Sequence, residues 1–275
     1  MVPMAERPTA LLRSADETKI SSRWLSPGDI RMGAGMEFNP RNKILAQIEP
    51  ATALRARGRL ERVALHARTV LQEPGNLVEW VWFPDDALIC VASETVGGES
   101  VSGGMIGWNG AYGAFEACGS RQSFTRAVVQ ISGQAWRIRS QHYREIFEQS
   151  AGLRAAVHKH MEALMVEARQ LVACSAIHPV ESRMCRVLLD ASARSHGGDE
   201  LSLTQASLAN ILGVQRTTIA VTASALQRRG MILTGRGRME LLDRRRIQET
   251  CCSCRETIAF AETEIFRSHA QVCEG

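Results

Sequence analysis

The stretch from Leu203 to Ile219, LTQASLANILGVQRTTI, constrains this chain more than any other part of its sequence. Thr204 is a favourable N-cap for a short helix. The buried face of that helix would consist of Leu208, Ile211 and Leu212. Gly213 then supplies the backbone freedom that a tight turn between two helices requires. The sequence therefore predicts a helix-turn-helix, with a second helix that starts near Gln215.

The second helix has an outward face that mixes hydrogen-bonding groups with methyl groups. The residues on this face are Gln215, Arg216, Thr217, Thr218, Val221 and Thr222. Thr and Val are poor helix formers, so their presence on a solvent face indicates a role other than helix stability. The guanidinium of Arg216 can pair with guanine O6 and N7, and a methyl group of Val221 can contact a thymine methyl. We expect this face, together with Thr204, to contact double-stranded DNA in a major groove rather than to serve protein contact alone.

A glycine-rich hairpin follows the second helix. Two short strand-like runs, residues 231–234 and 239–242, flank the sequence Gly-Arg-Gly-Arg. We expect Arg236 and Arg238 in this tip to contact DNA phosphates. Between positions 201 and 246, eight arginines stand against two carboxylates, a net charge of +6 in a chain whose total is +4. Such a concentrated cationic segment is typical of a module that binds a polyanion.

The N-terminal half has a different pattern. Seven short alternating segments, separated by turn residues, predict an antiparallel barrel or jelly roll. These segments are residues 59–65, 69–72, 78–83, 87–93, 99–106, 125–131 and 134–139. We assign residues 41–145 to this barrel. Residues 1–40 are interrupted by Pro, Gly and Ser, and we expect them to form a flexible extension.

A long apolar stripe follows the barrel, and we assign it to a helix over residues 146–177. Its residues recur at steps of three and four positions: Leu153, Val157, Met161, Leu164, Ala168 and Leu171. A long helix between two domains has little intrachain core to cover it, so we favour a dimer interface over packing on the barrel alone. The pair His178-Pro179 ends this helix. Residues 178–249 then form the DNA-binding domain, and residues 250–275 form a cysteine-containing tail.

The order of barrel, long helix, LTQASLANILGVQRTTI and GRGRMELLDR resembles the Crp/Fnr family of bacterial transcription regulators, over about residues 42–254. The resemblance implies an α+β fold with a cyclic-nucleotide-binding-like jelly roll, a homodimer through the central helix and a two-fold DNA operator. It also implies RNA polymerase as a partner. Arg216 matches the family position that contacts bases. Thr217 and Val221 stand where Glu and a later Arg are common, so we expect a different operator sequence.

The family's cyclic-nucleotide pocket is degenerate in this chain. Members that bind cyclic nucleotides hold the ribose with a Gly-Glu pair and the phosphate with an Arg that precedes Ser or Thr. Ala111 stands in place of the Glu, and Arg121 remains as a weak candidate with its register shifted by one residue. We therefore expect no response to cAMP, and the small-molecule effector stays unidentified.

The cysteines offer a second candidate site. No cysteine precedes Cys90, so the N-terminal iron–sulfur arrangement of oxygen-sensing relatives is absent. Thiolate and imidazole ligands do occur in two groups, Cys174 with His178 and Cys252 with Cys254. Because the two groups are far apart in sequence, we favour buried structural cysteines with a helix-capping histidine, and expect no metal or cofactor. The alternative is a metal- or redox-sensing regulator that uses these four residues.

Other classes of protein fit this sequence less well. No apolar run approaches the length of a membrane span, and the first 17 residues carry no secretory signal, so we expect a cytoplasmic protein without membrane contact. The barrel segment offers no cluster of histidines and carboxylates, no nucleophile motif and no phosphate loop. The sequence therefore predicts a DNA-binding regulator and not an enzyme.

Overall fold

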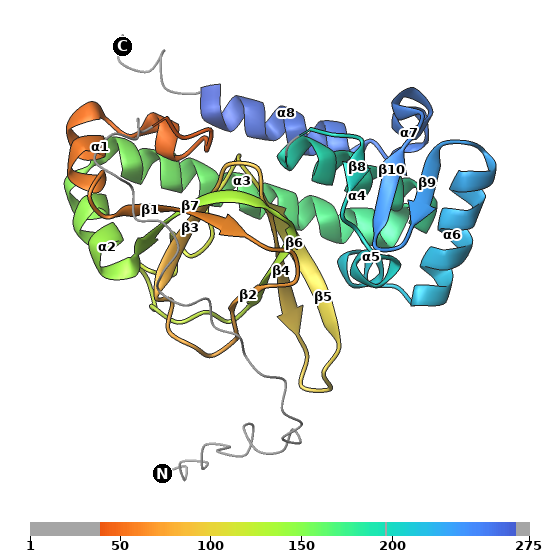
Figure 1. The fold of residues 1–275 in the computed structure, drawn as a ribbon, viewed down its shortest axis with the longest axis horizontal. Coiled ribbons are helices and arrows are strands. Elements are labelled where there is room, and N and C mark those ends of the chain that lie inside the picture. The colour runs from red at the N-terminus through yellow and green to blue at the C-terminus, as the bar shows by residue number, and fades with distance from the viewer. Residues whose placement is uncertain (1–38, 196, 268–275) are drawn as a thin grey trace, which may run out of the picture.

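The computed structural model describes residues 39–195 and 197–267 (Figure 1). The extension predicted for residues 1–40 falls outside this part of the chain, apart from its last two residues. The described residues form an N-terminal β-barrel, a long central helix and a C-terminal unit of helices with a small sheet. This is the predicted α+β architecture. No described helix has the length and apolar character that crossing a membrane would need.

Two antiparallel sheets form the barrel. The strands are β1 (Leu60–Leu65), β2 (Val70–Gln72), β3 (Trp80–Pro84), β4 (Leu88–Glu94), β5 (Ser100–Ile106), β6 (Arg126–Ile131) and β7 (Gly133–Arg139). One sheet has the order β1-β7-β3 and the other the order β2-β6-β4-β5. The ends of each strand lie within two residues of the predicted ends. The agreement arises because the alternating apolar residues that marked each segment face the interior. Trp82, Ile89, Tyr112 and Val129 belong to the buried cluster that fills the space between the sheets.

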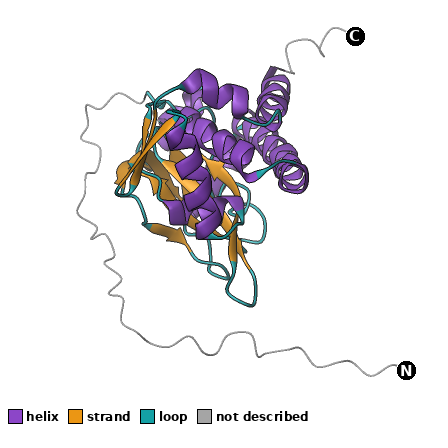
Figure 2. Ribbon diagram, turned by 90° about the vertical axis from the view of Figure 1, so that its right-hand side faces the viewer, coloured by secondary structure: helices purple, strands orange, loops and turns teal. Residues whose placement is uncertain are grey.

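Helices pack against one side of the barrel (Figure 2). They comprise a 3-10 turn η1 (Leu45–Gln47), α1 (Pro50–Ala56), α2 (Ser140–Gln149) and the long helix α3 (Ala151–Ile177). The long helix begins five residues later than the predicted position 146. Ser150 has an extended backbone there and separates α2 from α3. Its hydroxyl oxygen accepts the Leu153 N–H at 3.0 Å, which makes Ser150 the N-cap of α3.

The C-terminal unit starts after Pro179. It contains α4 (Val180–Arg194), β8 (Glu200–Leu201), α5 (Gln205–Leu212), α6 (Arg216–Arg228), β9 (Ile232–Gly235), β10 (Arg238–Leu241) and α7 (Arg244–Thr250). Its core is one apolar cluster in which Leu188, Leu208, Ile219 and Leu226 are fully buried. The cluster also includes Leu88, Met105 and Ile131 of the barrel, so the barrel and the C-terminal unit share buried surface.

The residues predicted as a cysteine-containing tail include a further helix, α8 (Cys254–Arg267). This helix lies alongside α3 and returns toward the N-terminal part of the barrel domain (Figure 1). There Glu262 forms an ion pair with Lys43 at 3.2 Å, and the Lys43 ammonium lies 3.6 Å from the ring centroid of Phe266. The segment therefore connects the C-terminal unit with the first residues of the described chain.

A buried ion pair joins α3 to the end of α4. Arg194 and Glu167 are 8% and 6% exposed, and their charged groups lie 2.8 Å apart. Arg194 also donates to the Met105 carbonyl at the end of β5, at 2.6 Å. Gly107 packs so closely on this segment that an added Cβ would lie 1.9 Å from the Arg194 carbonyl oxygen. Arg194 thus links barrel, central helix and C-terminal unit.

Candidate nucleic-acid interface

The turn between α5 and α6 has the predicted geometry. Thr204 caps α5 through a reciprocal pair of hydrogen bonds, in which the Ser207 N–H donates to Thr204 Oγ1 at 3.0 Å and the Thr204 N–H donates to Ser207 Oγ at 2.9 Å. Gly213 has a φ of +63°, a conformation that costs glycine little. The Val214 N–H then donates to the Ala209 carbonyl at 3.1 Å and closes the turn. The half-buried Thr204 side chain therefore serves the cap.

The expected reading face of α6 is exposed at its N-terminal end. Gln215, Arg216, Thr217 and Thr218 are all exposed, and Val221 is 70% exposed. Ile219, Ala223 and Leu226 hold the opposite face in the core. Thr222 differs from the other candidates, because it is half-buried and its hydroxyl donates to the Thr218 carbonyl at 2.8 Å.

The hairpin after α6 is part of a three-stranded sheet of order β8-β10-β9. Arg236 is exposed at the tip, next to Gly237, whose φ is +79°. The side-chain oxygen of Gln227 on α6 accepts the Thr234 N–H at 2.9 Å and ties the hairpin to the helix. In Figure 1 the hairpin and α6 lie next to each other at one end of the molecule, so one ligand surface can contact both.

Several arginines of the cationic segment 201–246 already form ion pairs with carboxylates of the same chain. Four of the eight arginines pair with carboxylates: Arg229 with Glu181, Arg238 with Glu200, Arg244 with Asp199 and Arg245 with Glu249. Glu200 lies on β8, a strand that the sequence reasoning did not identify. By contrast, Arg216 and Arg236 are exposed and form no ion pair within residues 39–195 and 197–267. Arg216 lies at the start of α6 and Arg236 at the hairpin tip, the two places where the sequence predicts DNA contact.

In the barrel, Ala111 of the degenerate nucleotide pocket is buried in contact with the long helix α3. Ala111 is 1% exposed, and both its N–H and its carbonyl lie 3.1 Å from Nε2 of His160 on α3. Burial lowers the pKa of His160 to about 4, so this imidazole is neutral at pH 7. Arg121, the effector candidate, is exposed in a turn with a φ of +61°.

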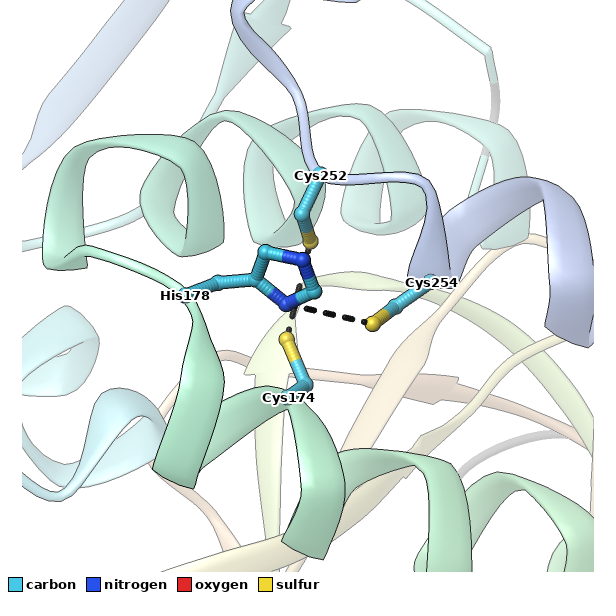
Figure 3. A group of neighbouring side chains, drawn as sticks. All are labelled: Cys174, His178, Cys252 and Cys254. Carbon is cyan, nitrogen blue, oxygen red and sulfur yellow. Dashed lines mark hydrogen bonds between the residues drawn. The ribbon is translucent and has the colours of Figure 1, made fainter.

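The structure brings the two cysteine–histidine groups together (Figure 3). Cys174 lies in the last turn of α3, His178 caps that helix, Cys252 lies in the loop after α7, and Cys254 begins α8. Their four ligand atoms all lie within 4.8 Å of one another. Whether these two groups meet is a question that their separation in sequence left open. It could not be settled from sequence, because the return of α8 along α3 decides it.

The cysteine–histidine cluster is largely buried. The three thiols are at most 6% exposed, and His178 is half-buried. Burial also raises the pKa of the Cys174 thiol to about 12. The Gln170 side-chain amide donates to Cys254 Sγ at 3.1 Å. Gln170 was not among the predicted site residues, since nothing in a lone glutamine on the helix marks it as a partner of a distant cysteine.

Comparisons with known proteins agree with this architecture. Residues 182–250 match the family model of the Crp-like helix-turn-helix domain. Among solved structures, the c-di-GMP-responsive global regulator CLP of Xanthomonas campestris is 17% identical, with a TM-score of 0.56 over 71% of this chain and all of its own. A putative Crp/Fnr regulator from Eubacterium rectale is 18% identical, with a TM-score of 0.59 over 76% of this chain and 97% of its own. FixK2 of Bradyrhizobium japonicum is 12% identical, with a TM-score of 0.60 over 70% of this chain and 98% of its own. No curated protein matches the sequence of this chain.

Residues 182–250, which contain α5 and α6, are thus a Crp-like helix-turn-helix domain, as the geometry of these two helices indicates. Over its described length the chain shares the fold of these solved regulators, which are 12–18% identical to it in sequence.

Proposed function

We propose that this chain binds a two-fold DNA operator as a homodimer and regulates transcription at that site. The exposed N-terminal face of α6 carries the proposal, because residues 39–195 and 197–267 leave Gln215, Arg216, Thr217 and Thr218 exposed. A helix presented in this way fits the major groove with its N-terminal residues toward the base edges. Arg216 would read a guanine, and the methyl groups of Thr217 or Val221 would contact thymine.

The homodimer would form through α3. Four apolar residues on this helix are exposed at steps of four, three and four positions: Met161, Met165, Ala168 and Val172. Met165 and Val172 are 54% and 71% exposed. The first two residues of the predicted stripe, Leu153 and Val157, are instead buried against the barrel. The interface that we propose therefore occupies the C-terminal half of α3, and α8 covers a different face of the same helix.

The barrel of this regulator would not respond to cAMP. Ala111 offers no carboxylate for a ribose hydroxyl, and its backbone is already hydrogen-bonded to His160. Tyr112 fills part of the barrel interior, where its hydroxyl lies 3.0 Å from Ser123 Oγ. As the family resemblance implies, RNA polymerase would be the protein partner at the promoter, and the cytoplasm the site of action.

Selection of bound fragments from genomic DNA by the purified protein tests this function. We expect recovered sites to contain two inverted half-sites whose centres are about one helical turn apart, roughly 34–36 Å, or a multiple of it. Fluorescence anisotropy should then show tighter binding to these sites than to random DNA at moderate ionic strength. Equal affinity for both would refute the proposal.

Arg236, at the tip of the hairpin, should increase the affinity for DNA of any sequence. Because Arg236 is exposed and would contact phosphate, its replacement by alanine should weaken binding to all DNA sequences alike and reduce the salt slope of log K by about 0.9 for each phosphate that it neutralises. The Arg238→Ala variant should give a similar loss, since its ion pair with Glu200 at 3.0 Å is exposed and exchanges readily for a phosphate. Anisotropy titrations over a salt series measure both effects. A loss restricted to one sequence would contradict phosphate contact.

A charge on the exposed face of α3 should separate the dimer. In the Met165→Glu variant, two carboxylates would meet across the apolar interface, and we expect the dimer dissociation constant to rise by about tenfold or more. Sedimentation equilibrium measures this constant. Leu54→Glu is the matched control, since Leu54 is 70% exposed on α1 and outside the proposed interface. Unchanged dimerisation of the Met165→Glu protein would place the interface elsewhere.

A further inference from the structure

The cysteine–histidine cluster has the spacing of a tetrahedral metal site. In the structure, Cys174 Sγ lies 3.5 Å from Cys252 Sγ, and Cys254 Sγ lies 3.5 Å from His178 Nδ1. Zinc–ligand bond lengths place two thiolate sulfurs about 3.8 Å apart around one tetrahedral ion, and a sulfur and a nitrogen about 3.6 Å apart. All four ligand atoms lie within 4.8 Å of one another and point toward a common centre (Figure 3). A small shift of the side chains would close this arrangement around an ion.

From this geometry we propose that Cys174, His178, Cys252 and Cys254 bind one Zn²⁺ ion per chain. Three thiolates and one imidazole form a closed donor set without an open position, which is typical of structural rather than catalytic zinc. Soft sulfur ligands also disfavour Mg²⁺ and Ca²⁺, which take oxygen ligands. The site goes beyond the proposed function, because neither the DNA-reading face nor the α3 interface includes any of these four residues.

The charges around the cluster suit a zinc–thiolate centre. A zinc ion with three thiolates and a neutral histidine carries a net charge of −1. Asp190 forms ion pairs with Arg186 at 3.3 Å and with Arg255 at 3.1 Å, so these three side chains sum to +1. Arg186 is 6% exposed and close enough to Cys174 and Cys252 to interact with them electrostatically. The ion would therefore bring the net charge of this group to zero.

Hydrogen bonds support the ligands from outside the donor set. The Gln170 amide donates to Cys254 Sγ at 3.1 Å, as donors next to thiolate ligands commonly do. Cys251, which directly precedes Cys252 in sequence, is directed elsewhere: its thiol donates to the Cys252 carbonyl at 3.3 Å. The chain thus distinguishes a ligand, Cys252, from the cysteine immediately before it.

Zinc in this position would join two segments that are distant in sequence, residues 174–178 and 252–254. The ligands come from the end of α3, from the α3–α4 junction at His178 and from the loop that leads into α8. An ion would therefore fix the start of the C-terminal unit relative to the central helix. It would also hold α8 along α3.

Metal analysis of the purified full-length protein, prepared without chelators, tests the site. We expect one zinc per chain by elemental mass spectrometry. We also expect the absorption bands of tetrahedral thiolate-bound Co²⁺ after exchange with cobalt. The Cys252→Ser protein should lose both signals, and the Cys251→Ser protein should keep them, so these adjacent residues form a matched pair. The wild-type measurements stand on their own if the Cys252→Ser variant fails to fold.

A variant outside the donor set gives a graded test. Gln170→Ala leaves all four ligands in place and should weaken zinc binding about 10- to 100-fold in competition with a chromophoric chelator. The proposal is overturned if zinc-supplemented wild-type protein holds no stoichiometric ion and gives no cobalt spectrum. It is also overturned if mass spectrometry of the isolated protein shows a Cys174–Cys252 disulfide in place of the metal. These results are independent of DNA binding, so the proposed function can fail while the zinc site holds, and the reverse.

Discussion

Replacement of Glu167 by alanine is expected to lower the free energy of unfolding by about 3–5 kcal/mol, because it leaves the buried charge of Arg194 without its partner. Both side chains are almost fully buried, and they lie 2.8 Å apart. Burial alone would lower the pKa of Arg194, but the carboxylates of Glu167 and Asp190 raise it above its usual value. Arg194 therefore stays charged and would have to move or recruit water. Urea denaturation at fixed protein and zinc concentrations measures the change.

An exposed ion pair provides the control for this result. Glu79 pairs with Arg139 at 3.1 Å, and both side chains are more than half exposed. The Glu79→Ala variant should therefore lose less than about 1 kcal/mol. Since Arg194 also bonds the Met105 carbonyl, the Glu167→Ala change should loosen contact between barrel and C-terminal unit and broaden the transition. Equal losses in the two variants would show that the buried pair does not hold these parts together.

Local sequence patterns were sufficient for most of the fold. The barrel strands could be predicted because each carries its own alternation of apolar residues, as β6 does with Ala127, Val129 and Ile131 facing the interior. The helix-turn-helix could be predicted because its signals are also local. Thr204 caps the first helix, Gly213 takes the left-handed conformation, and Ile219 faces the core.

The remaining features depend on contacts between distant segments. The cysteine–histidine cluster brings together distant residues such as His178 and Cys254, which are 76 positions apart, and no local pattern places α8 against α3. The pairing of Arg238 with Glu200 likewise depends on the two-residue strand β8, which is too short to have a periodicity. One signal was available for α8: Cys254 and Ile258, four positions apart, form its buried face.

The predicted dimer stripe shows the same limit in another way. A helical period identifies which residues share a face, but not which neighbour covers that face. Leu153 was correctly assigned to an apolar face of the helix, but that residue packs against the barrel of the same chain. Further along α3, Met165 and Val172 are exposed, because the helix has passed beyond the barrel residues that cover its first turns. Because the barrel covers only the first turns of α3, the proposed dimer interface lies in the C-terminal half of this helix.

Replacement of Arg216 by alanine is expected to weaken operator binding most among the DNA-contacting residues. A bidentate contact with guanine contributes about 1–3 kcal/mol, and a homodimer makes it twice, so the operator complex should lose about 2–6 kcal/mol. The loss arises from DNA binding alone, because Arg216 is exposed and forms no ion pair in the described part of the chain. Unfolding by urea should therefore be unchanged. Anisotropy titrations with the selected operator measure the affinity.

Base-pair substitutions in the operator separate a base contact from a phosphate contact. Changing the guanine opposite Arg216 should cost the wild-type protein about 1–3 kcal/mol per half-site, and should cost the Arg216→Ala protein almost nothing. Arg55→Ala is the control: Arg55 is exposed on α1, at the end of the molecule opposite α6, and its loss should leave affinity and base preference intact (Figure 1). If the Arg216→Ala protein still discriminates at every operator position, α6 does not read bases through this residue, and its N-terminal end does not face the groove.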